Sequence, residues 1–432
     1  MQELFSTIKK PIKAKSNGLA NKLHHTDIPF HNWYRFVLSF PPHLVREYIN
    51  KFGLNNDSTI LDPFCGTGTT IVESKLHGIN SIGIEANPMT HFASTVKVDW
   101  SLDPSELLKH ASLVASEAKK ESNYCKTNLR ALSPDAHNLL IKNSVSPLPL
   151  HKGLILLDKI RLLKNDRLYN HELLAFAKTM VLYASNLHFG PEVGVCRNKK
   201  EDAPVVESWI SEIKRMVDDL CFRKPEKDSY AIIHRADSRQ LQNILEPNSI
   251  DAIFTSPPYP NEKDYSRTTR LESVLLGFIN DKDELRALKK NLLRSNTRNV
   301  YKGDDDDKWI SNHGEIQRIA TKIERRRIKL GKTSGFEKLY SKVTRLYFGG
   351  MARHLATLRP FLKANAYLGY VVGDQASYLR VMIRTGSLFA DIAESLGFKV
   401  ESIDLFRTRF STTTKKEMRE EVVVLRWPGH KG

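Results

Sequence analysis

The sequence predicts an α/β fold, a doubly wound sheet interrupted by helical insertions. One observation is a unit in which a strand-like run, "STILDPF", a Gly-rich turn, "CGTGTT", a helical run, "TIVESKLHG", and a second strand-like run, "SIGIEANP", follow one another. The other is the return of strand-like runs at "SYAIIHRADSRQL" and "SIDAIFTSPPY", each followed by polar residues. A chain of 432 residues with 41% apolar residues can bury a core of this kind.

The remaining elements follow from hydrophobic periodicity. Upstream of the unit, "FPPHLVREYINKF" predicts a helix that begins at a proline pair. Residues 101–228 consist of long helical stretches such as "HELLAFAKTMVLYASNLHF", without strand alternation. After a second helical and loop segment, the sheet is expected to finish with a helix, "MARHLATLRPFL", a strand, "AYLGYVVGD", a helix, "LFADIAESLGF", and an antiparallel pair, "KVESIDLF" and "EEVVVLRW".

The charge balance points to a polyanionic partner. Lys plus Arg outnumber Asp plus Glu by 66 to 49, which gives a net charge of +17. Residues 286–345 hold 17 basic and 7 acidic side chains, so +10 of this excess lies there, around an acidic stretch, "RNVYKGDDDDKW", that we expect to be exposed. A basic surface that only keeps the protein soluble is the alternative.

Cysteine usage and hydropathy indicate the cellular compartment in which the protein is expected. Cys65, Cys125, Cys196 and Cys221 form no C-x-x-C pair, so neither a zinc site nor a disulfide framework is indicated. The sequence also lacks an apolar run as long as a membrane span or a signal peptide. We therefore expect a cytoplasmic protein with no metal site.

The Gly-rich turn is a candidate nucleoside site. Gly66 and Gly68 allow the backbone to approach a ligand, and the helix that follows directs its amide end toward it. Ile71 stands where a dinucleotide fingerprint has its third glycine, and a Walker A lysine is missing. Glu85 ends the next strand and is placed to accept hydrogen bonds from a ribose. The loop alone does not decide between a nucleoside site and a structural turn.

The stretch "TSPPY" after the strand at 250–255 also has two readings. Proline cannot donate to a sheet ladder, so a strand end followed by a turn would explain Pro257 and Pro258. The pair also supplies carbonyl groups without amide donors, beside the hydroxyl of Ser256. That combination would suit a site that accepts hydrogen bonds.

Taken together, "DPFCGTGTT" and "TSPPY" resemble the motifs of S-adenosylmethionine-dependent DNA amino-methyltransferases, which modify cytosine N4 or adenine N6. "FPPHLVREYI", "IGIEANP" and "RADSRQL" are similar to further segments of that family, and the resemblance covers residues 50–100 and 230–265. It implies a Rossmann-like methyltransferase sheet with S-adenosylmethionine as cofactor. Glu85 would bind the cofactor's ribose and Asp237 its adenine amino group. The residues expected around the rest of the cofactor are Asp62, Phe64, Gly66, Thr67, Gly68 and Thr69.

The same resemblance assigns the catalytic residues Ser256, Pro257, Pro258 and Tyr259. The Ser256 hydroxyl and the Pro257 carbonyl would accept hydrogen bonds from the exocyclic amine, and Tyr259 would stack on a base that has been flipped out of the duplex. No catalytic histidine or covalent cysteine is expected. The serine is more typical of cytosine N4 enzymes, with adenine N6 and then RNA bases as alternatives. Asn261, Asp264 and Tyr265 would line the base pocket or form a polar loop.

These expectations divide the chain into six segments. They are a basic N-terminal arm (1–25), the cofactor half of the catalytic domain (26–100), a helical insertion (101–228), the catalytic half (229–265), a basic helical and loop segment (266–345) and the C-terminal part of the sheet (346–432). The insertion and the basic segment are expected to hold double-stranded DNA, and a cognate restriction endonuclease is a possible partner. A nicotinamide-dependent dehydrogenase and a catalytically silent DNA-binding regulator are the competing functions; the incomplete glycine fingerprint disfavours the first and the intact motifs disfavour the second.

Overall fold

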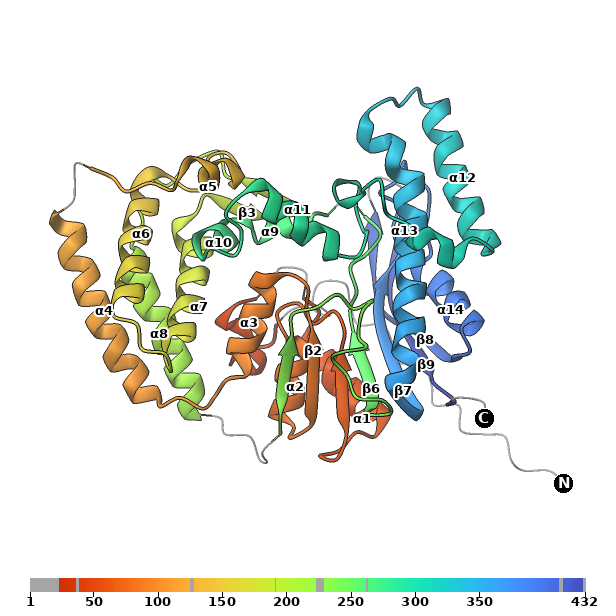
Figure 1. Cartoon of the computed structure of the whole chain (residues 1–432), viewed down its shortest axis with the longest axis horizontal. Helices are drawn as coiled ribbons and strands as arrows, with labels where there is room; N and C mark the ends of the chain where they lie inside the picture. Colours follow the sequence, from red (N-terminus) through yellow and green to blue (C-terminus); the bar gives the residue numbers. More distant parts are fainter. Residues whose placement is uncertain are drawn as a thin grey trace.

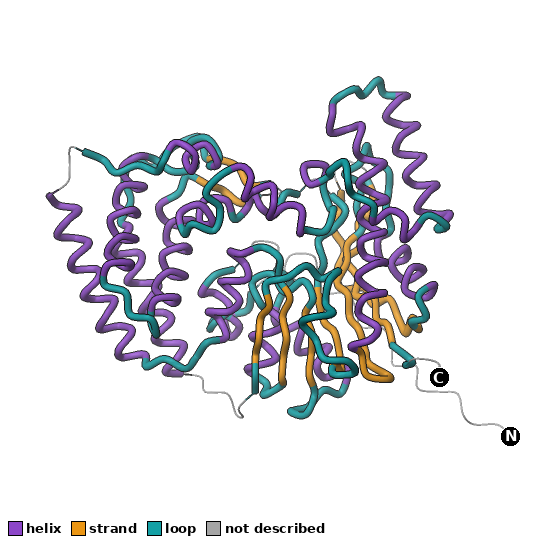
Figure 2. Tube along the Cα trace, in the orientation of Figure 1, coloured by secondary structure: helices purple, strands orange, loops and turns teal. Residues whose placement is uncertain are grey.

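The fold was analysed in a computed structural model that describes residues 23–35, 39–124, 128–190, 192–222, 229–261, 263–411 and 415–429. Figures 1 and 2 show a central sheet between two helical regions. Of the predicted N-terminal arm, residues 1–22 lie outside the described residues.

A seven-stranded sheet confirms the predicted doubly wound α/β fold. Five neighbouring strands are parallel, whereas β9 lies antiparallel between β7 and β8. The last two strands form the predicted antiparallel pair. In spatial order the strands are β5 (Ala231–His234), β2 (Asn80–Ile84), β1 (Thr59–Asp62), β6 (Ile250–Thr255), β7 (Leu362–Gly373), β9 (Lys416–Arg426) and β8 (Lys399–Ser411).

Helices cover both faces of this sheet, which is why its central strands β1 and β6 are mostly buried and contain Ile, Leu and Phe. Helix α1 (Pro42–Phe52) packs its apolar stripe on one face, against Ile60 and Phe254. Helices α13 (Gly335–Leu358) and α14 (Thr385–Ser395) cover the other face, against Leu61 and Ile253. Neighbouring residues of one strand therefore belong to opposite cores, as the period of two requires.

The loops at the carboxyl ends of β1 and β2 lead into two further helices, α2 (Thr69–Leu76) and α3 (Pro88–Val98). Gly68 is the N-cap of α2, and Asn87 is the N-cap of α3, where its side chain accepts a hydrogen bond from the amide of Met89. Both helices run back along the sheet, so each strand-to-helix turn lies at the same edge.

The predicted helical insertion packs beside α3 on the β5 side of the sheet (Figure 1). Four of its helices share one apolar core with α2 and α3, namely α4 (Pro104–Tyr124), α6 (Pro147–Leu162), α7 (Tyr169–Thr179) and α8 (Val205–Phe222). The short helix α5 (Pro134–Leu139) belongs through Leu139 to a smaller, separate cluster. The expectation of helix through residue 189 was wrong, because the chain leaves α7 through a π-helical turn, Met180–Ala184, and forms a hairpin of β3 (Leu187–Phe189) and β4 (Val193–Val195). Strands of three residues are too short to produce a readable alternation.

The second helical segment crosses above the sheet and then rises beside it (Figure 1). It contains α9 (Tyr265–Thr268), α10 (Arg270–Leu275), α11 (Lys282–Asn291), the short turns η4 (Thr297–Asn299) and η5 (Asp306–Ile310), and α12 (Gly314–Lys329). The segment boundary drawn at 345/346 falls inside α13. The acidic stretch is not exposed throughout, since the Asp306 side chain is buried. No helix in the described part of the chain is long and apolar enough to cross a membrane.

Candidate active site

A cavity of about 1050 Å³ lies at the carboxyl ends of the parallel strands. Loops that follow β1, β2, β5, β6 and β7 form its walls, together with the β8–β9 hairpin and part of the chain after α11. In open α/β sheets this edge is where ligands bind. The cavity lies at the upper end of the usual volume of a small-molecule site, roughly 300–1,000 Å³, so it has room for a donor and part of a second substrate.

The structure brings ten of the twelve predicted site residues to this cavity. They are Phe64, Gly66, Thr67, Thr69, Glu85, Asp237, Ser256, Pro257, Pro258 and Tyr259. Asp62 and Gly68 do not line it. Of the further candidates, Asn261 and Tyr265 line the cavity, whereas Asp264 is buried behind it and pairs with Lys289 at 2.8 Å.

The Gly-rich turn between β1 and α2 cradles one end of the cavity. Gly66 has a φ of +52°, and a Cβ built on it would meet no atom within 4 Å, so the space beside this backbone is open to a ligand. Gly68, at φ +80°, occupies the N-cap of α2 instead and closes the turn through its amide, which donates to the Cys65 carbonyl at 2.7 Å. The turn therefore positions backbone beside the cavity without filling it.

Glu85 lies opposite this turn and is fixed by backbone amides. The Gly66 amide donates to its Oε2 at 2.8 Å, and the Asn87 amide donates to its Oε1 at 2.7 Å. Burial raises the pKa of Glu85, although these two amides oppose the shift. A carboxylate has about four acceptor positions, so Glu85 can also accept hydrogen bonds from hydroxyl groups of a ligand. The glycine cradle and this oriented carboxylate fit a nucleoside-bearing donor.

Asp62 supports the turn from behind the cavity. It is fully buried, and its Oδ1 accepts hydrogen bonds from the Thr255 hydroxyl at 2.6 Å and from the Phe64 amide at 3.2 Å. Burial raises the pKa of Asp62 to about 7. It thus ties the carboxyl end of β1 to that of β6, and its direct contact with a cofactor stays a prediction.

Lys97 also supports the turn, and the sequence analysis missed it. Lys97 lies on helix α3, and its buried Nζ donates a hydrogen bond to the Thr67 carbonyl at 2.7 Å. Burial, and next the positive charge of Arg35, lower the pKa of Lys97 to about 7. A lysine within the apolar run of α3 was the available signal, because a lysine is rarely buried without a partner.

Ser256 and its neighbours line the same cavity, directly after β6. The Ser256 hydroxyl donates to the Val371 carbonyl at 3.3 Å, so the lone pairs of its Oγ stay available to accept hydrogen bonds. Pro257 and Pro258 line the cavity beside it. Burial, and then the negative charge of Glu420, raise the pKa of Tyr259, which keeps its phenol neutral.

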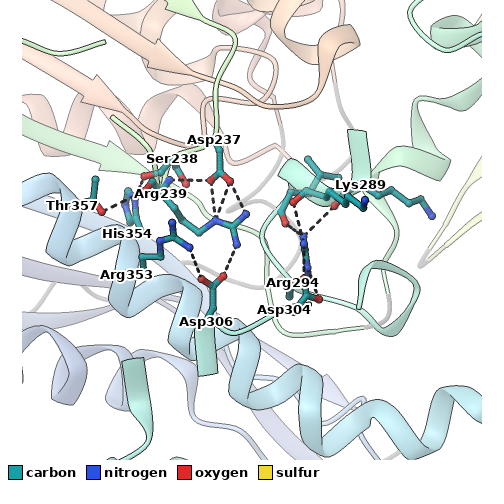
Figure 3. Close-up of polar contacts among 12 residues, drawn as sticks. Asp237, Ser238, Arg239, Lys289, Arg294, Asp304, Asp306, Arg353, His354 and Thr357 are labelled. Carbon is teal, nitrogen blue, oxygen red and sulfur yellow. Dashed lines mark hydrogen bonds and ion pairs between the residues drawn. The ribbon is translucent and has the colours of Figure 1, made fainter. Parts of the chain in front are cut away.

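Asp237 lines the cavity after β5, but its carboxylate is already bonded. Arg239 grips it through two nitrogens, with Nε 2.9 Å from Oδ1 and Nη2 2.6 Å from Oδ2 (Figure 3). The sequence analysis named Asp237 and missed Arg239, although the two are only two residues apart. The role of Asp237 toward an adenine amino group stays a prediction.

Four cations, which we name the cationic rim, line the cavity, and sequence reasoning missed this group. It comprises Lys263, Arg380, Arg407 and Arg409. Arg407 pairs with Glu420, whereas no carboxylate in the described part of the chain forms an ion pair with the other three. Burial, and next the charge of Arg409, lower the pKa of Lys263. The basic run around residues 407–416 was the signal.

Backbone strain and an exposed aromatic ring accompany the rim. Leu379 and Arg380 are consecutive non-glycine residues with φ of +54° and +60°, and both line the cavity. Such strain of left-handed backbone concentrates at functional sites. The Phe410 ring, 60% exposed, lies at the mouth beside Arg409. Cations and an aromatic ring at one opening suit a nucleic-acid strand.

Comparisons with known proteins agree with this site. Residues 5–94 match the family model for DNA methylases of the N6/N4 type. Over 92% of its length the chain is 27% identical to "Type II methyltransferase M.BsoBI" of Geobacillus stearothermophilus, of which it covers 84%. It is 22% identical to "Type II methyltransferase M.AvaI" of Nostoc sp., over 93% of this chain and 87% of the relative.

A short region is more similar to another relative. Over 68 residues, which are 16% of this chain and 13% of the relative, it is 41% identical to "Type II methyltransferase M.MjaII" of Methanocaldococcus jannaschii. The sheet and the cavity at its carboxyl edge agree with these similarities. Together they support a DNA amino-methyltransferase of the N6/N4 type, to which the chain is similar.

Proposed function

We propose that this DNA methyltransferase transfers a methyl group from S-adenosylmethionine to the exocyclic N4 amino group of a cytosine flipped out of duplex DNA. One observation carries the proposal. Ser256 and Pro257 line the same cavity as the Gly66 turn and Glu85, which supports a donor and an acceptor meeting there.

At the donor end, Glu85 would accept hydrogen bonds from the ribose hydroxyls, while the Gly66 turn would run alongside the donor. Phe64 and Ile84 supply apolar surface at the same end. When bound, S-adenosylmethionine supplies a methyl group activated by a positively charged sulfur. Strong base catalysis is therefore unnecessary, and alignment and exclusion of water become the main tasks of the protein.

At the acceptor end, the chain has to make a poor nucleophile reactive. The lone pair of an exocyclic amine is delocalised into the ring. The Ser256 Oγ and the Pro257 carbonyl would accept its two hydrogens and favour a tetrahedral nitrogen as the bond forms. Proline backbone supplies this carbonyl rigidly and without a competing amide at that residue. The neutral Tyr259 ring would stack on the base.

The cationic rim would hold the phosphates on either side of the flipped nucleotide. Lys263, Arg380 and Arg409 line the mouth without carboxylate partners among the described residues. A second cleft of about 600 Å³ lies in the basic segment and is lined by Arg286, Lys290 and Lys302 among others. Together they support duplex DNA bound across the cavity mouth, with binding that weakens steeply as salt rises.

The biological setting is proposed from the relatives, whose names describe Type II methyltransferases. We propose that this chain marks cytoplasmic DNA at a short sequence, within a restriction-modification system that includes a cognate endonuclease. The helical insertion and the basic segment would read that sequence, since both border the cavity side of the sheet (Figure 1).

Purified protein tests the reaction directly. It is incubated with long unmethylated duplex DNA and methyl-labelled S-adenosylmethionine, and the digested nucleosides are separated. We expect label in N4-methylcytosine and a loss of roughly 100-fold for Ser256→Ala, because one acceptor in the transition state is removed. Ser249→Ala is the matched control, since that hydroxyl donates to the Glu246 carbonyl and does not line the cavity. Label in N6-methyladenine would overturn the base assignment, and no labelled base would overturn the reaction.

A further inference from the structure

A row of four alternating charges runs from the cavity into the second helical segment. It consists of Asp237, Arg239, Asp306 and Arg353 (Figure 3). Beyond its contacts with Asp237, Arg239 places Nη1 2.5 Å from Asp306 Oδ2, and Arg353 places Nη1 3.1 Å from Asp306 Oδ1. The side chains of the inner three are 6–11% exposed, so each charge depends on its neighbour.

Helix α13 fixes the backbone of the same loop after β5. His354 Nδ1 lies 2.8 Å from the Ser238 carbonyl, and the Thr357 hydroxyl donates to the Arg239 carbonyl at 3.5 Å. Arg353 extends the row from the same helix, as the labelled side chains in Figure 3 show. Helix α13 therefore holds the backbone of Arg239, while Asp306, which packs against the same helix, holds its side chain.

A pair of glycines in α13 makes the approach of Asp306 possible. A Cβ built on Gly349 would lie 2.0 Å from the Asp306 carbonyl oxygen, and one on Gly350 would lie 2.5 Å from Cδ1 of Leu293. Glycine inside a helix is destabilising relative to alanine, so two in succession within a 24-residue helix need a packing reason. That reason is the segment that lies against them.

This segment, residues 291–307, also forms one wall of the cavity, and we name it the wall segment. Asn291, Leu292, Leu293, Ser295 and Asn299 line the cavity. Within the wall segment, the Arg294 guanidinium pairs with Asp304 at 2.8 Å. Two contacts fix the segment to other parts of the chain: the Tyr378 hydroxyl donates to the Ser295 carbonyl at 2.9 Å, and Arg239 pairs with Asp306.

We propose that Arg239 and Asp306 are positioning residues for the methyl donor, which they serve by joining the wall segment to the Asp237 loop. The inference rests on the proposed function, because it assumes that S-adenosylmethionine occupies this end of the cavity. Neither side chain needs to touch the donor. Arg239 orients the Asp237 carboxylate, and its ion pair with Asp306 holds the wall segment against the Asp237 loop. Loss of the Arg239–Asp306 pair would therefore loosen both of these cavity walls.

Calorimetry tests this role by measuring binding of S-adenosylhomocysteine, the demethylated product, so the experiment needs neither DNA nor turnover. Asp306→Asn keeps the shape but removes the charge, and we expect about tenfold weaker binding. Gly349→Ala displaces the Asp306 backbone and should act in the same direction. The matched controls are Asp305→Asn, whose carboxylate is 59% exposed, and Gly335→Ala, whose Cβ would meet no atom within 4 Å. Both controls should stay within about twofold of the parent protein.

Kinetics separate positioning from a general loss of structure. For Asp306→Asn we expect KM for S-adenosylmethionine to rise about tenfold while kcat at saturating donor stays within about twofold. If Asp306→Asn and Gly349→Ala do not fold, Arg353→Met tests the outer end of the row, where the side chain is 34% exposed, and should weaken binding about threefold.

Parent-like binding by the folded variants would overturn the inference and leave the proposed function standing. An unchanged KM with a lowered kcat would overturn it too, because the row would then act on the acceptor side. No binding of S-adenosylhomocysteine by the parent protein would instead overturn the proposed function.

Discussion

Glu85 and Asp237 follow the neighbouring strands β2 and β5 and line the same cavity, yet their carboxylates are held in different ways. Glu85 is bonded by two backbone amides, both within twenty residues of it along the chain. Asp237 is bonded by the Arg239 guanidinium, which in turn depends on Asp306, a residue 67 positions away from Arg239. The first carboxylate is positioned by a local turn and the second by tertiary structure.

This difference explains what the sequence could predict. A Gly-rich turn, a strand and an acidic strand end are local signals, so β1, β2 and the position of Glu85 followed from hydrophobic period and turn residues. The end of β6 could be predicted in the same way, because strand ends are among the few places in a sheet where proline occurs.

The ion-pair row could not be predicted in the same way. Asp306 lies in a run of four aspartates, and nothing local distinguishes the buried one from Asp305, which is exposed. Gly349 and Gly350 were a visible clue, but their meaning depends on a segment more than forty residues upstream in the chain. The cationic rim was missed for the same reason, because Arg407 and Arg409 reach the cavity through the antiparallel hairpin of β8 and β9.

The largest effect should come from removing the cation that Asp237 and Asp306 share. Arg239→Met leaves two buried carboxylates near each other without their common partner. We expect the free energy of unfolding to fall by about 3–5 kcal/mol, measured by urea denaturation. Lys308→Met is the control, because its pair with Asp305 is exposed at both ends and should contribute less than about 1 kcal/mol. Equal losses in the two variants would show that the row does not stabilise the fold.

The histidine beneath the Asp237 loop should make stability depend on pH. Burial lowers the pKa of His354 from 6.5 to about 4. Between these values the unfolded chain binds a proton that the folded chain does not, so stability is lost as pH falls from about 6.5 through about 4. The loss attributable to His354 should reach about 3 kcal/mol.

His354→Gln removes this titration, and denaturation curves between pH 4 and pH 7 provide the measurement. The difference between parent and variant should shrink as pH falls. A difference that is the same at every pH would rule out a neutral, buried His354 as its source.

A smaller effect on binding distinguishes the two carboxylates. Glu85→Gln removes the charge and leaves one of the Gly66 and Asn87 amides facing an NH2 group instead of an acceptor oxygen. We therefore expect S-adenosylhomocysteine to bind more weakly by about 2 kcal/mol, roughly 30-fold. Stability should fall by only about 1–2 kcal/mol, because one hydrogen bond but no ion pair is lost. Asp237→Asn should instead lower both stability and binding, since it weakens the grip of Arg239. If Glu85→Gln and Asp237→Asn behave alike in both measurements, the contrast drawn between them is wrong.

The smallest loss of stability is expected for Gly66→Ala, which should nevertheless weaken ligand binding clearly. Gly66→Ala places a side chain at φ +52° in open space, which costs about 1 kcal/mol of stability. The new methyl group points into the cavity, so binding of S-adenosylhomocysteine should weaken by at least tenfold. Gly53→Ala is the matched control, since Gly53 has a φ of +67° with no atom within 4 Å and lies at the end of α1, outside the cavity lining. It should lose similar stability with parent-like binding.

The central claim is that Ser256 and the Gly66 turn serve one reaction, methyl transfer to cytosine N4. The most direct measurement is mass spectrometry of nucleosides from the DNA of a methylation-free host that expresses the parent chain or Ser256→Ala. We predict N4-methylcytosine with the parent chain and none above background with the variant. N6-methyladenine, or no new base although the protein is folded and abundant, would contradict the claim.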